Sequence, residues 1–135
     1  MMTEATIPPD VRQSLSAALR VTKRIFDAWG LSREEAAKVL GVSLEQLERL
    51  GDKADCSSAV TSDLIERTSY LLGIEKYLEI LLNDEKATIT DWMARPSGAE
   101  VFEGQSPKQM LMKGRVEDFE KVRDYLGFMA STPFS

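Results

Sequence analysis

The 135-residue chain contains no histidine, one cysteine and no long apolar run. The absence of histidine excludes every catalytic triad and metal site that needs an imidazole. The single Cys56 excludes an intramolecular disulfide and a Cys-x-x-Cys site, and it suits a reducing cytoplasm. No stretch approaches the roughly 18 apolar residues of a membrane span, and the acidic, proline-containing N-terminus lacks the apolar core of a signal peptide. We therefore expect a cytoplasmic protein with no membrane segment, no metal, no cofactor and no small-molecule substrate.

Basic residues are in the minority, with 17 Lys and Arg against 22 Asp and Glu and a net charge of -5. This balance argues against a polycation that simply coats nucleic acid. The carboxylate pairs Glu34-Glu35 and Glu117-Asp118 stand at the expected starts of helices, where the helix dipole favours acidic residues. Nothing in the sequence indicates the cleft and the shifted acidities that a catalytic pair needs. An enzyme is therefore not expected.

Strand signals are scarce and helix boundaries are frequent, so the sequence predicts an all-α fold. Residues 1–10 are expected to form a flexible arm, with Asp10 as the N-cap of a first helix that begins at Val11. Gly30 is expected to end this helix in a left-handed conformation. Its apolar stripe, at helical spacing, consists of Val11, Leu15, Ala18, Leu19, Thr22, Phe26 and Trp29.

Residues 31–50 carry two capping boxes in close succession. Ser32 with Glu35, and Ser43 with Gln46, each have the S-x-x-E/Q spacing. The turn Gly41-Val42-Ser43 separates them. This spacing predicts two short helices joined by a sharp turn, which is the layout of a helix-turn-helix. The expected inward positions are Ala36, Ala37, Leu40, Val42, Leu47 and Leu50.

The second short helix, Ser43 to Leu50, is the candidate recognition helix. Gln46 is suited to read an adenine edge, and Arg49 is suited to reach guanine or phosphate. Glu45 and Glu48 oppose phosphate, so this surface is poor for tight DNA binding by a single chain. A dimer or a larger complex would supply the missing contacts. The candidate DNA-contacting residues are Ser32, Arg33, Ser43, Leu44, Gln46 and Arg49.

The rest of the chain indicates further helices. Residues 51–61 are expected to form a polar linker, after which Thr61 or Ser62 caps a helix that ends near Leu82. Gly73 marks either a bend in that helix or a close helix crossing. A helix that contains Trp92 is expected to end at Pro96-Ser97-Gly98. Ser106 and Gln109 form a third capping box, with Pro107 at the first helical position. The last helix carries Phe119, Val122, Leu126 and Met129 at spacings of three and four, and Ser131 to Ser135 are expected to form an irregular tail.

After the helix-turn-helix comes a distinctive series of residues: Trp92, Pro96, Gly104, Ser106, Pro107, Leu111, Gly114, Val122 and Gly127-Phe128. This order resembles the antitoxins of the Xre/MbcA/ParS type, whose partners are RES-domain toxins. The resemblance covers about residues 15–130. It implies an Xre-like helix-turn-helix bundle followed by a small helical C-terminal toxin-binding domain.

The resemblance also implies a function. Such an antitoxin neutralises a toxin that destroys NAD+ by obstructing the entrance to its active site. It represses its own operon through the helix-turn-helix, usually with the toxin bound, and it forms homodimers. The expected division is an arm at 1–10, the helix-turn-helix domain at 11–60, a connecting or dimerisation helix at 61–83, and the toxin-binding domain with its tail at 84–135.

Most residues of the series are explained by folding, because Pro107 starts a helix, the glycines end helices, and Leu111 and Val122 pack. The candidate toxin contacts are therefore Phe128, Met129 and Phe134. An alternative is a free-standing helix-turn-helix transcription regulator with a C-terminal dimerisation domain. Such a regulator would bind its operator tightly without a toxin.

Overall fold

The computed structural model of the chain describes residues 9–49, 61–83 and 85–131. Within these ranges the chain forms helices and no strand, which confirms the predicted all-α fold. None of the described helices combines the length and apolar character that a membrane crossing requires. The elements are α1 (Pro9–Ala28), α2 (Arg33–Leu40), α3 (Leu44–Arg49), α5 (Ser62–Leu82), α6 (Lys86–Ala94), the 3-10 helix η2 (Glu100–Phe102), α7 (Pro107–Met112) and α8 (Val116–Ser131).

Two predicted boundaries differ from the observed ones. Helix α1 begins at Pro9, so Asp10 lies inside the helix and is not its N-cap. Proline is favoured in a first helical turn, because its fixed φ is helical and no amide hydrogen is needed there. Helix α8 continues to Ser131, so the predicted irregular tail begins one residue too early. Residues 1–8 of the expected arm, Cys56 with its linker, and Phe134 lie outside the described residues.

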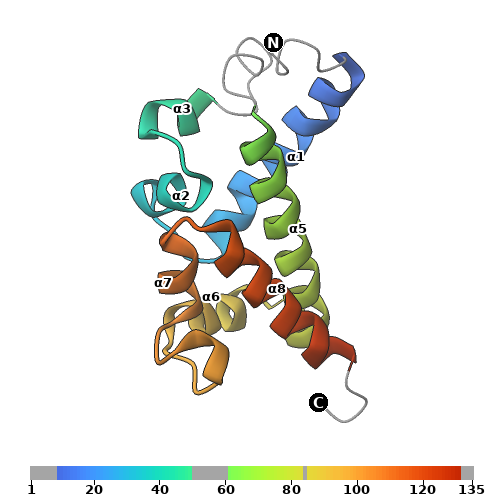
Figure 1. Cartoon of the computed structure of the whole chain (residues 1–135). Coiled ribbons are helices and arrows are strands. Elements are labelled where there is room, and N and C mark those ends of the chain that lie inside the picture. Colours follow the sequence, from blue (N-terminus) through green and yellow to red (C-terminus); the bar gives the residue numbers. More distant parts are fainter. Residues whose placement is uncertain (1–8, 50–60, 84, 132–135) are drawn as a thin grey trace.

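Helix α5 is the central element of the fold (Figure 1). It packs on α1 and, most extensively, on α8. The side chain of Thr61 accepts a hydrogen bond from the amide of Leu64 at 3.1 Å, so Thr61 and not Ser62 is the N-cap. The buried face recurs at spacings of three and four and consists of Leu64, Thr68, Leu71, Ile74 and Leu78.

Helices α5 and α8 approach each other at two glycines. A Cβ atom at Gly73 would lie 3.4 Å from Cδ of Arg123, and one at Gly127 would lie 3.3 Å from the ring of Tyr77. The guanidinium of Arg123 lies 4.6 Å from the ring centroid of Tyr70. Gly73 therefore marks a helix crossing, one of the two alternatives that the sequence left open.

One hydrophobic core extends through both halves of the chain. The indole nitrogen of Trp29, at the end of α1, donates to Glu75 of α5 at 2.7 Å. The hydroxyl of Thr90, on α6, donates to the carbonyl oxygen of Ala28 at 2.6 Å. The helix-turn-helix region is therefore packed and hydrogen-bonded against the C-terminal half.

Candidate functional site

Helices α2 and α3 form the predicted helix-turn-helix around Leu47, which is 4% exposed. Gly41 has φ of 72°, the left-handed conformation that the sharp turn requires. Of the predicted inward positions, Ala36, Ala37, Leu40 and Leu47 are buried, Val42 is half-buried and Leu50 lies outside the described residues. Val39 is also buried, although the sequence pattern did not single it out.

Both predicted capping boxes of this unit are formed. The amide of Glu35 donates to Ser32 Oγ at 3.1 Å, and the amide of Ser32 donates to Glu35 Oε1 at 2.8 Å. The amide of Gln46 donates to Ser43 Oγ at 3.1 Å, and the amide of Ser43 donates to Gln46 Oε1 at 3.0 Å. Three of the candidate DNA contacts, Ser32, Ser43 and Gln46, therefore also hold the helix starts.

All six candidate DNA contacts are exposed, and they lie on the adjacent helices α2 and α3 or immediately before them (Figure 1). The two arginines among them are engaged with glutamates. Arg33 of α2 forms an ion pair with Glu48 of α3. Arg49 lies 3.4 Å from Glu45, one turn earlier on α3. The surface thus presents arginine and glutamate side by side.

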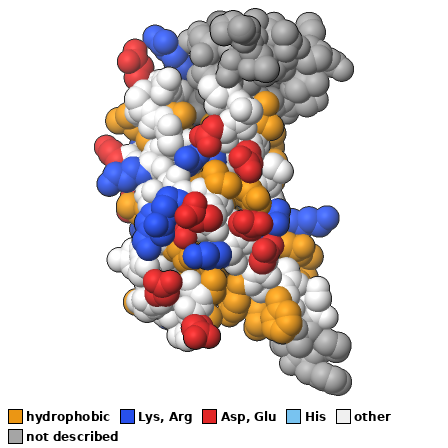
Figure 2. All heavy atoms as spheres, viewed as in Figure 1, with side chains coloured by type: hydrophobic (Ala, Val, Ile, Leu, Met, Phe, Trp, Pro, Cys, Tyr) orange, Lys and Arg blue, Asp and Glu red, His pale blue; other side chains and the backbone are white. Residues whose placement is uncertain are grey.

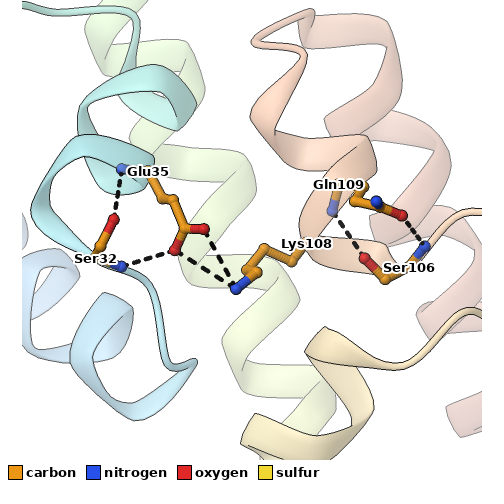
Figure 3. A network of polar contacts seen from close by, with 5 residues as sticks. All are labelled: Ser32, Glu35, Ser106, Lys108 and Gln109. Carbon is orange, nitrogen blue, oxygen red and sulfur yellow. Dashed lines mark hydrogen bonds and ion pairs between the residues drawn. The ribbon is translucent and has the colours of Figure 1, made fainter.

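Helix α2 is joined to the C-terminal half by an ion pair between Glu35 and Lys108 of α7 (Figure 3). Lys108 Nζ lies 3.4 Å from Glu35 Oε2, and each side chain is about one quarter exposed, at 23% for the lysine and 27% for the glutamate. The backbone hydrogen bond from Ser32, aided by the charge of Lys108, lowers the pKa of Glu35.

The third predicted capping box is also formed, at the start of α7 beside Lys108. The amide of Gln109 donates to Ser106 Oγ at 3.1 Å, and the amide of Ser106 donates to Gln109 Oε1 at 2.9 Å.

Arg67 of α5 forms a second link to α2. Its Nη1 donates to the carbonyl oxygen of Val39 at 3.1 Å, its Nε donates to Asp63 at 2.7 Å, and its guanidinium lies 5.6 Å from the ring centroid of Phe119. The side chain is 13% exposed. A cation at the C-terminal end of a helix is favourable, so Arg67 stabilises the end of α2. Nothing in the sequence pattern singles out Arg67, because its partners in α2 and α8 are distant along the chain.

The C-terminal part is built around a row of three aromatic rings. Trp92 and Phe102 meet edge to face with centroids 6.0 Å apart, and Phe102 and Tyr125 do so at 5.4 Å. Leu111 and Val122 are fully buried, and Ser106 and Pro107 are buried at the start of α7. Gly104 and Gly114 have φ of 82° and 74°.

Trp92 and Pro96 line a groove of about 360 Å³ at the end of α6. The other lining residues come from α5, α6 and the following loop and are Leu82, Thr88, Asp91, Arg95, Ser97 and Gly98. In the part of the chain that the structure describes, no group of acidic or cysteine side chains is arranged to hold a metal ion.

A second feature of this part is the apolar surface near the ends of α5 and α8. Phe128 is 69% exposed and Ile80 is 55% exposed, whereas Met129 is half-buried. Figure 2 shows hydrophobic side chains gathered at the lower right, where Figure 1 places the ends of these two helices. Two of the three candidate toxin contacts therefore lie at one end of the molecule, and the third, Phe134, is outside the described residues.

Comparison with known proteins gives the family. Residues 10–73 match the antitoxin Xre-like helix-turn-helix domain, and residues 78–131 match the antitoxin Xre/MbcA/ParS C-terminal toxin-binding domain. The chain belongs to the Xre/MbcA/ParS antitoxin family. A relative from Sinorhizobium fredii (strain NBRC 101917 / NGR234), the uncharacterized protein y4oB, is 36% identical over 110 residues, which cover 82% of this antitoxin and 81% of the relative. No solved structure matches the chain.

The two matched domains of the antitoxin meet inside one helix. The first match ends at residue 73 and the second begins at residue 78, and both positions lie in α5. The antitoxin thus has a helix-turn-helix domain and a toxin-binding domain, with a toxin as its partner. Because α5 is one uninterrupted helix, the two domains share this element.

Proposed function

We propose that this antitoxin neutralises a RES-domain toxin that degrades NAD+, by covering the entrance to the toxin's active site. The choice of a RES-domain toxin is supported by the residue series from Trp92 to Phe128, which resembles that of antitoxins with RES partners. The observation that carries the proposal is the exposure of Phe128, at 69%, on α8 of the toxin-binding domain. Large aromatic side chains are enriched among the residues that dominate protein–protein binding. Phe128, Met129 and Phe134 are the proposed contacts.

The proposed second role is repression of the antitoxin's own operon. Arg33, Gln46 and Arg49 are exposed on the helix-turn-helix, as a reading surface requires. The neighbouring glutamates oppose phosphate, so we infer that the repressing species is a homodimer, bound most tightly as the toxin complex. In this proposal residues 11–60 bind DNA, residues 61–83 connect and dimerise, residues 84–135 bind the toxin, and the complex acts in the cytoplasm.

The experiment that tests neutralisation is co-expression of the full-length antitoxin with a RES-domain toxin, followed by measurement of cellular NAD+. We expect NAD+ to be depleted when the toxin is expressed alone and to recover when the antitoxin is also expressed. We also expect the two proteins to co-purify. Continued depletion despite soluble antitoxin would contradict it. Tight operator binding by the chain alone, without any recovery of NAD+, would instead indicate the free-standing regulator with a C-terminal dimerisation domain.

A further inference from the structure

The outward face of the helix-turn-helix carries its two arginines in ion pairs with glutamates of α3. Arg33 pairs with Glu48, and Arg49 pairs with Glu45. The four side chains are between 50% and 78% exposed, so none of them is fixed by burial. These arginines are the ones that the proposed function assigns to DNA.

Glu48 of α3 contacts two other helices, α1 and α2. Its carboxylate pairs with Arg33 at the start of α2, and its carbonyl oxygen accepts a hydrogen bond from Lys23 Nζ of α1 at 3.4 Å. Lys23 and Arg33, the two partners of Glu48, line a cavity of about 210 Å³ between the three helices, together with Phe26, Leu31 and Leu47. The position of Glu48 beside Arg33 is thus set by contacts to both α1 and α2.

A carboxylate and a phosphate compete for the same guanidinium. Non-specific DNA affinity arises when cations of a protein release counterions from phosphates, and it grows with each phosphate contacted. An arginine that stays paired with a glutamate contacts no phosphate and releases no counterion from the DNA. Such an arginine adds nothing to the salt dependence of binding.

We propose that Glu48 and Glu45 mask Arg33 and Arg49 from DNA, so that the free antitoxin holds its recognition surface in a state of low affinity. The inference rests on the proposed function, which assigns DNA binding to α2 and α3, and it adds how that binding is regulated. Exposed ion pairs are weak, so the mask lowers affinity by a modest factor and is lifted at modest cost. Any partner or second copy that draws these glutamates away unmasks the arginines.

The test measures binding of the full-length antitoxin to a fluorescent DNA duplex of arbitrary sequence over a series of salt concentrations. The variants are Glu48→Gln and Glu45→Gln, which keep side-chain size and remove the charge. Glu34→Gln is the matched control, because Glu34 is an exposed residue of the same unit that forms no ion pair with the described residues. It lowers the negative charge equally but releases no arginine.

Masking predicts that Glu48→Gln and Glu45→Gln each steepen the slope of log Kobs against log salt by about 0.9, the value for one added phosphate contact. It also predicts severalfold tighter binding at low salt. Glu34→Gln is expected to leave the slope unchanged. Adding Arg33→Gln to Glu48→Gln is expected to remove the gain.

Two results would overturn the masking proposal. The slope of both glutamine variants could equal that of the original protein, or Glu34→Gln could give the same gain, in which case the glutamates act only as general negative charge. If Glu48→Gln fails to fold, Glu45→Gln still tests the masking proposal. The ion pair of Glu45 lies within a single helix, so its loss does not separate α2 from α3. Absence of DNA binding by every variant at low salt would overturn the proposed DNA binding as well, and so differs from failure of masking alone.

Discussion

Glu35, which completes the capping box of α2, also forms the ion pair with Lys108 of α7. One carboxylate therefore holds the start of the helix-turn-helix and attaches it to the toxin-binding domain (Figure 3). We expect Lys108→Met to lower the free energy of unfolding by about 1 kcal/mol, because a partly exposed pair is worth little more than that. Urea unfolding measures this difference. Lys113→Met, at an exposed lysine just after α7, is the control and is expected to change stability less.

The same contacts predict a dependence of stability on pH. Since the pKa of Glu35 is lowered in the folded state, its contribution is complete above its ordinary pKa of 4.5 and is lost as the pH falls through the folded value. Gln is also accepted at this capping-box position, so Glu35→Gln isolates the charge. We expect this variant to be less stable than the original protein at pH 7 and equally stable well below pH 4. A constant difference across this range would contradict the assignment.

The local features of the fold could be predicted from the sequence. Capping boxes, helix-ending glycines and apolar spacing depend on residues within a few positions, and the boxes at Ser32, Ser43 and Ser106 all form as predicted. The contacts that join the two domains could not be predicted in this way. Lys108 meets Glu35 only after the chain has folded back, and nothing near either residue in the sequence indicates the other.

The candidate DNA-binding surface could likewise be predicted only in part from the sequence. Exposure of Gln46 and Arg49 on α3 follows from helical spacing and is observed. The pairing of Arg33 with Glu48 depends on the angle between α2 and α3, which spacing does not give. The α1 boundary was wrong because Pro9 and Asp10 both suit a helix start, and the sequence offered no means of ranking them.

The placement of Leu47 between α2 and α3 gives a strong stability prediction. Leu47→Asp would place an unpaired carboxylate in a site that is 4% exposed, at a cost on the order of several kcal/mol. We expect loss of the cooperative thermal transition or a large fall in melting temperature, measured by circular dichroism. Leu44→Asp, at an exposed position three residues earlier, is the control. Equal melting of the two variants would show that Leu47 does not hold the unit together.

Arg49 tests whether α3 enters a DNA groove. We expect Arg49→Ala to weaken operator binding by about 1–3 kcal/mol, the range for an arginine that contacts a base. The measurement is a titration of operator DNA with the antitoxin, alone and in complex with the toxin. As the control, Arg95→Ala removes an exposed arginine that also pairs with an acidic residue four positions earlier, Asp91, but lies at the C-cap of α6. An equal effect of both variants would remove Arg49 from the proposed interface.

Phe128 tests the proposed toxin contact without disturbing the fold. Because its side chain is 69% exposed, Phe128→Ser removes apolar surface from solvent and leaves the core on the opposite side of α8, with Val122 and Leu126, unchanged. We expect melting to be preserved and toxin affinity to fall by about tenfold or more, as for an aromatic residue at the centre of an interface. Calorimetric titration with a RES-domain toxin, and recovery of NAD+ in co-expressing cells, give two independent measurements.

The control is Val21→Ser, which removes a partly exposed apolar side chain from α1, outside the matched toxin-binding domain. This variant is expected to bind the toxin normally. Undiminished binding by Phe128→Ser would move the contact away from the end of α8, and the groove lined by Trp92 and Pro96 would then be the next surface to alter.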